Sequence, residues 1–252
     1  MASLLRHPYF LLVVTFSALW AAARIGLAFR KKHHEPDEDT EDFTFVVGAT
    51  LTLLGLIIGF TFSMAVSRYD QRKNLEEQEA NAIGTEFVRV EALPPADASK
   101  IRSLLHLYLD KRIAYYAARD ETSLVEINAA TVQLQNQLWA SVITPAKLQP
   151  SPITALTVTG MNDVLNAQGY AQAAWWNRIP AAAWILLVTI SIFCNLLIGY
   201  GVRLKSDLLF LILPIVLSVS LFLIADIDSP RRGVIHVRAE NLDSLAESLK
   251  AQ

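Results

Sequence analysis

The chain has 252 residues, of which 53% are hydrophobic and 18% are charged, and its formal net charge is -2. This near-neutral balance excludes a nucleic-acid-binding protein that depends on a basic surface. The hydrophobic residues are gathered in blocks, which is typical of a protein that spans a lipid bilayer. A single cysteine, Cys194, cannot form an intrachain disulfide.

The first apolar block covers residues 9–29 and is interrupted by Arg24. A membrane span needs about 20 mostly apolar residues, and an arginine near the end of a span can extend to the lipid headgroups. A cleaved signal peptide is the alternative, because Arg6 precedes an apolar core and the small residues 21–23 resemble a cleavage site. The apolar character resumes after Arg24, over residues 25–29, which favours a retained helix.

Three further blocks have the length of a membrane span. Residues 43–66 carry no charge and form the clearest one. Residues 181–200 follow Pro180, a residue suited to the start of a helix. Residues 208–225 contain Pro214, which a helix tolerates in lipid. We therefore expect a first transmembrane pair within residues 1–66 and a second within 179–226.

The middle of the chain, residues 67–178, has the features of a helical region outside the membrane. Good helix formers continue directly from the second span, and Pro94 and Pro95 end this segment. Amphipathic segments follow over 96–118 and 122–142, then a proline-rich linker, then a helix over 153–178 that leads into the third span. Residues 227–252 form a polar C-terminal tail. The sequence predicts an all-α integral membrane protein.

The charges that flank the spans favour one orientation. Two spans, a long insert and two more spans place the N-terminus, residues 67–178 and the C-terminus on one side. That side carries seven basic residues near the span ends, against five in the loops 30–42 and 201–207. The positive-inside rule therefore predicts that the larger side is cytoplasmic. In a bacterium this corresponds to the inner membrane.

Residues that could carry chemistry are few. The chain has no glycine-rich phosphate loop, paired-histidine zinc motif or nucleophile elbow, so we expect neither an enzyme nor a cofactor. Asp226 and Asp228 follow the fourth span and form a weak candidate metal site, since hard cations prefer several oxygen ligands. The ordinary alternative for two acids beside Arg231 and Arg232 is a salt bridge or a helix end. Trp175 and Trp176 suggest an aromatic belt before the third span.

Small residues recur along the second span. Gly55, Gly59 and Ser63 are spaced by four residues and therefore lie on one face of a helix. Small residues at this spacing let helix backbones approach closely in lipid. Such a face packs against another helix, and when several copies pack around an axis it can line a pore.

The stretch "GFTFSMAVSRY", Gly59 to Tyr69, resembles the second-span signature of bestrophins. The order of spans and the segment "DIDSPRRG" after span four are also similar. The segments "SRYDQRKNLEEQEANAIGT", "NRIP" and "ADIDSPRRG" more specifically resemble a bacterial bestrophin-like family that is known as a domain of unknown function. The resemblance implies a homopentameric ion channel with span two around the axis.

Carried over by position, the resemblance implies a hydrophobic pore neck at Thr52, Leu56 and Phe60. Thr52 departs from that pattern because it is polar. The bestrophin calcium clasp is a dense acidic run, whereas this chain has Arg231, Arg232 and His236 near Asp226 and Asp228, which argues against calcium gating.

Two functions stay open from the sequence. The first is a channel for inorganic ions. Arg68 and Arg72 at the cytoplasmic vestibule would favour anions if they face the axis, whereas Asp70, Glu76 and Glu77 would favour cations, so that selectivity is undetermined. The second is a non-conducting membrane scaffold or sensor whose cytoplasmic helices bind a partner.

Overall fold

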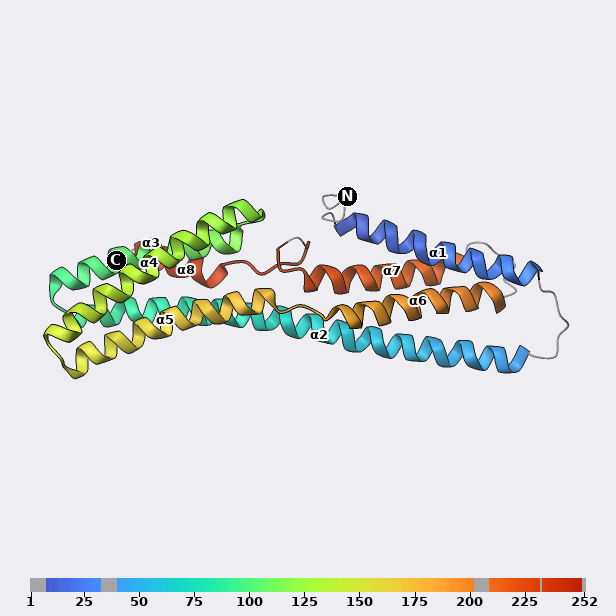
Figure 1. Cartoon of the computed structure of the whole chain (residues 1–252), viewed down its shortest axis with the longest axis horizontal. Coiled ribbons are helices and arrows are strands. Elements are labelled where there is room, and N and C mark those ends of the chain that lie inside the picture. Colours follow the sequence, from blue (N-terminus) through green and yellow to red (C-terminus); the bar gives the residue numbers. More distant parts are fainter. Residues whose placement is uncertain (1–7, 33–39, 202–208, 232, 251–252) are drawn as a thin grey trace. The chain divides into compact units, whose positions relative to one another are not determined.

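A computed structural model describes residues 8–32, 40–201, 209–231 and 233–250. All regular elements in these ranges are helices, as predicted. Four of the basic residues that contribute to the predicted orientation lie outside the described residues: Arg6, Arg203, Lys205 and Arg232. The elements in chain order are α1 (Pro8–Lys32), α2 (Thr40–Arg89), η2 (Val90–Ala92), α3 (Pro95–Ala117), α4 (Glu121–Leu148), α5 (Pro152–Trp176), α6 (Ala181–Gly201), α7 (Leu209–Asp228) and α8 (Glu240–Lys250) (Figure 1).

The chain divides into two compact units. Unit 1 comprises residues 1–68 and 178–236, and unit 2 comprises residues 69–177 and 237–252. The long helix α2 belongs to both, because its apolar N-terminal part lies in unit 1 and its charged C-terminal part lies in unit 2. The insert helices α3, α4 and α5 fall within unit 2, and the break between α5 and α6 lies at the boundary with unit 1.

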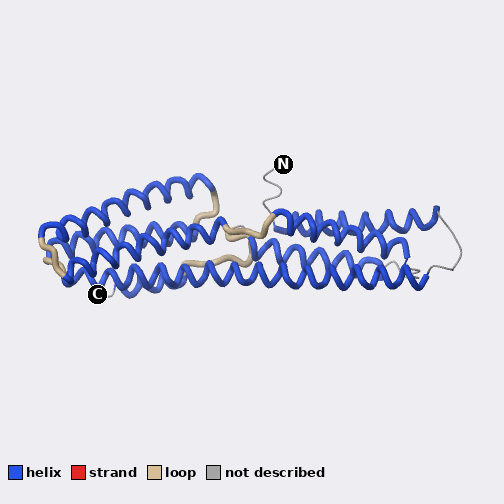
Figure 2. Tube along the Cα trace, turned by 60° about the horizontal axis from the view of Figure 1, so that its bottom comes forward, coloured by secondary structure: helices blue, strands red, loops and turns tan. Residues whose placement is uncertain are grey.

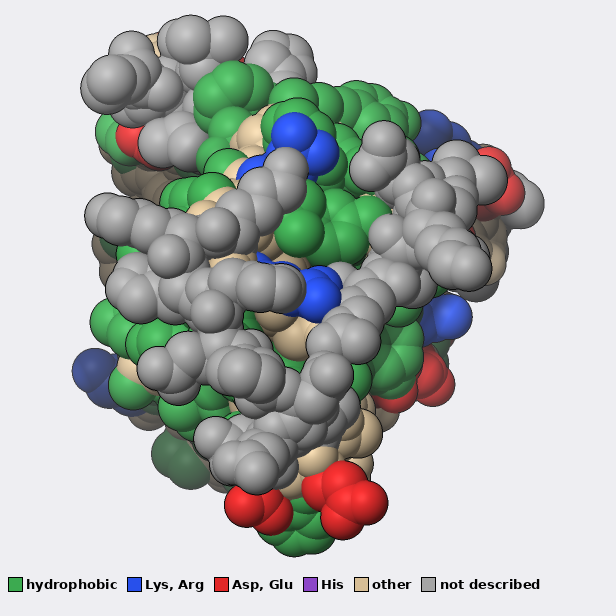
Figure 3. All heavy atoms as spheres, turned by 90° about the vertical axis from the view of Figure 1, so that its right-hand side faces the viewer, with side chains coloured by type: hydrophobic (Ala, Val, Ile, Leu, Met, Phe, Trp, Pro, Cys, Tyr) green, Lys and Arg blue, Asp and Glu red, His purple; other side chains and the backbone are tan. Residues whose placement is uncertain are grey.

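Unit 1 contains α1, the first part of α2, α6 and α7, which run alongside one another in both ribbon views (Figures 1 and 2). The described chain has four helices long and apolar enough to cross a membrane, as predicted. Many large hydrophobic side chains of these helices point outward instead of into the unit, which suits a lipid environment. Hydrophobic side chains are visible over much of the described surface in Figure 3.

Two glycines bring α1 and α6 into backbone contact. A Cβ atom on Gly26 would overlap the carbonyl group of Leu196, and one on Gly199 would overlap the carbonyl group of Ala23. The contact is reciprocal, because the glycine of each helix lies directly against the backbone of the other helix. Close approach of this kind is a main source of helix packing in membranes, and it fixes the scaffold beside which α2 lies.

Unit 2 is a helical bundle with one continuous hydrophobic core. The core residues come from α2, η2, α3, α4, α5 and α8 and include Ile83, Ile101, Leu138 and Met161. Asp120 caps the start of α4 by accepting a hydrogen bond from the Ser123 backbone N–H. These contacts hold the charged part of α2 against the insert helices.

Three details of unit 2 differ from the prediction. Helix α4 continues to Leu148 and contains Pro145, because a helix can pass a proline near its end at the loss of one backbone hydrogen bond. Helix α5 ends at Trp176, and four residues separate it from α6, so it does not run into the third span. Trp175 is buried against the rings of Tyr115 and Tyr116, so it belongs to the core of unit 2 and not to an aromatic belt.

The C-terminal tail contains a helix, α8, where the sequence predicts only a polar tail. Its apolar residues Leu242, Leu245 and Leu249 are spaced by three and four residues, and Leu242 and Leu249 are buried. The carboxylate of Glu76 accepts hydrogen bonds from the backbone N–H groups of Asn241 and Leu242, at 3.0 and 2.9 Å. Glu76 therefore caps the first turn of α8 from α2.

Candidate functional site

The three predicted neck residues are all exposed within the single chain. Leu56 is 54% exposed and Phe60 is 66% exposed, and Thr52 is also exposed. The Thr52 hydroxyl donates to the Gly48 carbonyl one turn earlier at 2.9 Å, which satisfies it within its own helix. The side chains of Leu56 and Phe60 offer apolar surface that the described residues of unit 1 leave uncovered.

The predicted packing residues lie on the same exposed side. A Cβ atom on Gly55 or Gly59 would meet nothing within 4 Å, and Ser63 is exposed. The buried residues of this part of α2 are Leu54, Thr61 and Ala65. At about 100° per residue, these lie roughly half a turn away from Leu56 and Ser63. The small-residue face is therefore not the face that packs within the chain.

The three predicted vestibule charges lie in different surroundings. Asp70 is exposed, and Arg68 is partly buried with its guanidinium 3.7 Å from the Met64 sulfur atom. Arg72 is only 1% exposed. It donates to the backbone carbonyls of Ala174 and Asn177 at 3.1 and 3.0 Å, where α5 ends. Arg72 thus stabilises the C-terminus of α5, and its side chain is buried within the single chain.

Further buried charges lie one and two turns beyond Arg72. The carboxylate of Glu79 pairs with the guanidinium of Arg112 from α3, and both side chains are fully buried. The Tyr116 hydroxyl donates to Glu79 at 3.1 Å, and the Arg112 guanidinium lies 4.4 Å from the centre of the Tyr115 ring. Sequence reasoning missed this cluster, although a charge at every third or fourth position of α2 (Arg72, Glu76, Glu79) was the signal that could have shown it.

The side chains of Asp226 and Asp228 accept hydrogen bonds from backbone N–H groups of neighbouring segments in unit 1. Asp226 accepts hydrogen bonds from the backbone N–H groups of Val234 and Ile235, each at 2.8 Å. Asp228 accepts from the Ile179 backbone N–H at 3.1 Å and thereby ties the end of α7 to the segment before α6. The described residues contain no group of three or more His, Cys, Asp or Glu side chains that could hold a metal ion. These contacts support the structural alternative for this acidic pair.

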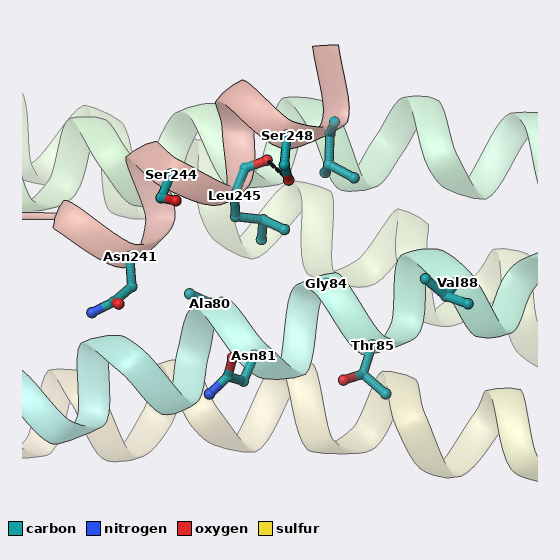
Figure 4. A pocket seen from close by; sticks show the side chains of 10 residues that line it. Ala80, Asn81, Gly84, Thr85, Val88, Asn241, Ser244, Leu245 and Ser248 are labelled. Atoms are coloured by element: carbon teal, nitrogen blue, oxygen red, sulfur yellow. Dashed lines mark hydrogen bonds between the residues drawn. The ribbon is translucent and has the colours of Figure 1, made fainter. Parts of the chain in front are cut away.

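A pocket of about 520 Å³ lies between α2 and α8 in unit 2. Figure 4 shows Leu245 of α8 extending toward α2, where Gly84 leaves room for it. The other lining side chains are neutral: Ala80, Asn81, Thr85, Val88, Asn241, Ser244, Ser248 and Leu249. The lining of this pocket carries no charged side chain.

Comparisons with known proteins found one family model and several solved structures that are similar to this chain over most of its length. A model of the bestrophin-like domain matches residues 11–242. The crystal structure of a bacterial bestrophin homolog from Klebsiella pneumoniae is similar with a TM-score of 0.68 at 13% identity, over 96% of this chain and 97% of that chain. A mutated bestrophin homolog from the same organism gives a TM-score of 0.69 at 12% identity, over 95% of this chain and 98% of that one.

A third crystal structure, described as a membrane protein, has a TM-score of 0.68 at 14% identity and covers 96% of this chain and 97% of its own. No relative is found among curated protein sequences. The solved structures share the fold, and the domain match extends over most of the sequence. The chain is therefore an integral membrane protein that belongs to the bestrophin-like family.

Proposed function

We propose that the protein is a homopentameric ion channel in which the apolar part of α2 surrounds the axis and Leu56 and Phe60 form a hydrophobic neck. The observation that carries the proposal is the uncovered face of α2. Thr52, Leu56, Gly59 and Ser63 share that face and are exposed within the chain, while the opposite face packs on unit 1. Family membership supports the same function.

A ring of Leu and Phe side chains is suited to gating. An apolar constriction loses water when it is narrow and admits water and ions when it widens. The glycines at positions 55 and 59 would let neighbouring copies of α2 approach closely beside that ring. Thr52 would place a polar ring one turn above Leu56, so that the apolar neck is two rings long.

The charges on this face lead us to propose a preference for cations. Asp70 and Glu77 follow Leu56 and Ser63 at seven-residue spacing on an uninterrupted helix, and both are exposed. Arg72 and Glu76 are buried and take other roles. At about 100° per residue, Arg68 lies almost half a turn from Asp70, whereas Lys73 lies only about 60° from Asp70 and about 40° from Glu77. Lys73 is exposed and would offset part of this acidic charge. Acidic rings at a pore mouth favour cations.

The N-terminus, unit 2 and the C-terminus would then lie in the cytoplasm, with the spans in a bacterial inner membrane. The mass of the purified protein in detergent tests the assembly. A mass of five chains supports the proposed assembly, and a monomer or dimer contradicts it.

Reversal potentials in a salt gradient test the selectivity. We expect Asp70→Asn with Glu77→Gln to lower the permeability ratio of cations over anions. The matched control is Glu121→Gln, an exposed acid at the start of α4. An unchanged ratio in the double variant would contradict the assignment of these acids to the pore mouth.

A further inference from the structure

The carboxyl group of Glu86 is buried without a hydrogen-bond partner. Its side chain is 0% exposed, and neither carboxyl oxygen has a partner among the described residues. Glu86 lies on α2 roughly five turns beyond the apolar segment 43–66, so it belongs to unit 2 and not to the proposed span. A buried carboxylate without hydrogen bonds is costly, which favours the protonated acid.

The room for this carboxyl comes from a glycine on the neighbouring helix. A Cβ atom on Gly160 of α5 would overlap the Glu86 carboxyl group and the Arg89 guanidinium. Gly160 itself is buried. The Glu86 carboxyl and the Arg89 guanidinium thus both lie beside Gly160 of α5. A change in the charge or position of either group therefore acts directly on the contact between α2 and α5.

Two charged groups act on Glu86. Arg89 lies one turn away on α2, and Asp163 lies one turn beyond Gly160 on α5. The Arg89 and Asp163 side chains form a long ion pair at 3.8 Å, and both are partly exposed. Such a pair contributes little stability. Asp163 therefore holds Arg89 only weakly, and a second acid, Glu86, also lies next to Arg89.

We propose that Glu86 is a proton-controlled switch in the α2–α5 contact: in the protonated state Arg89 pairs with Asp163, and in the ionised state Glu86 draws Arg89 away and loosens the packing at Gly160. Deprotonation releases one proton to solvent and leaves a carboxylate that needs a cation. Arg89 is the cation within reach, since it already contacts the same glycine. The switch is a property of unit 2 and does not depend on the pore proposal.

The direction of the pH dependence follows from burial. Burial is the largest influence on Glu86 and raises its pKa to about 8, Arg89 lowers it and Asp163 raises it. For an acid whose pKa is higher in the folded state, the stabilising contribution is full below the unfolded value and is lost as pH rises through the folded value. The α2–α5 contact should therefore weaken as pH passes through about 8.

The test follows the purified full chain in detergent between about pH 6 and pH 10. Infrared spectroscopy reports the carbonyl stretch of protonated carboxylic acids, and thermal unfolding reports stability. In the wild type the infrared band should decline with a midpoint near pH 8, and thermal stability should fall as pH rises toward that value and level off above it. Glu86→Gln, which keeps a neutral side chain of similar shape, should remove the infrared band and flatten the stability profile. Asp110→Asn, at an exposed acid on α3, should change neither.

Two further variants test the role of Arg89 and keep the proposal testable if Glu86→Gln fails to fold. Asp163→Asn removes a neighbouring negative charge and should lower the midpoint. Arg89→Gln removes the neighbouring positive charge and should raise it. Midpoints that move in the same direction, or a carboxylic acid band that is absent in the wild type at neutral pH, would overturn the switch.

Discussion

The two parts of α2 differ in which of their side chains are buried. In unit 1, large apolar residues such as Leu56 and Phe60 are exposed. In unit 2, the ionisable residues Arg72, Glu79 and Glu86 are buried. Lipid or a further copy of the chain can cover the apolar residues. A buried ionisable group must instead be compensated by the helices around it, as for Arg72 and Glu79, or be protonated, as we propose for Glu86. The polarity of a residue in α2 therefore does not indicate whether its side chain is exposed to water.

The difference also separates two kinds of role. The buried charges hold helices together within the chain, since Arg72 contacts α5, Glu76 caps α8 and Glu79 pairs with α3. The exposed apolar face makes no comparable contact with the described residues. Variants in unit 2 should therefore change folding, and variants on the exposed face should change assembly and conduction.

Breaking the buried ion pair should have the largest effect. Arg112→Ala would leave the Glu79 carboxylate buried without its cation, and loss of one partner of a buried pair costs about 3–5 kcal/mol. We expect a large fall in the midpoint of thermal unfolding in detergent. The double variant Arg112→Met with Glu79→Leu should unfold at a higher temperature than Arg112→Ala, because it leaves no unpaired charge. If the single and double variants are equally destabilised, the ion pair is not the cause.

Removing Arg72 should have the next largest effect. Arg72→Ala would leave the carbonyls of Ala174 and Asn177 without their charged donor, and hydrogen bonds to charged groups contribute about 1.5–3 kcal/mol each. Lys73→Ala, at the neighbouring exposed position, should stay within about 0.5 kcal/mol of the wild type. Unfolding of both variants measured side by side checks this contrast, and equal stability of the two would show that Arg72 does not support α5.

A comparison of two glycines sharpens the contrast within unit 1. Gly199→Ala forces a methyl group against the Ala23 backbone, and overpacking of this kind costs about 1–3 kcal/mol. Gly59→Ala meets nothing within the chain, so the stability of the single chain should not change. Gly59→Ala should instead weaken self-association, which the mass distribution in detergent reports. A Gly59→Ala protein that keeps its assembly but loses chain stability would contradict the proposed role of Gly59 in assembly.

The spans could be predicted because the signal is local. Each apolar block is long enough to cross a bilayer, and helical spacing alone places Leu56 with Ser63. The surroundings of Arg72 could not be predicted, because its acceptors lie about 100 residues later in the sequence. The close approach of α1 and α6 at Gly26 and Gly199 could not be predicted either, because the two helices are far apart in the sequence. The sequence analysis missed α8 because this helix is short and polar. The burial of its apolar residues depends on contacts with α2, near Gly84 and Glu76, that the local sequence does not show.

Single-channel current through planar bilayers tests the central claim most directly. Wild-type protein should pass ions, and Leu56→Ala with Phe60→Ala should increase the conductance, because a smaller apolar ring stays hydrated. Ile212→Ala, at an exposed apolar residue of α7, should leave the conductance unchanged. Absence of current in both the wild type and the double variant would contradict the channel and favour a non-conducting scaffold.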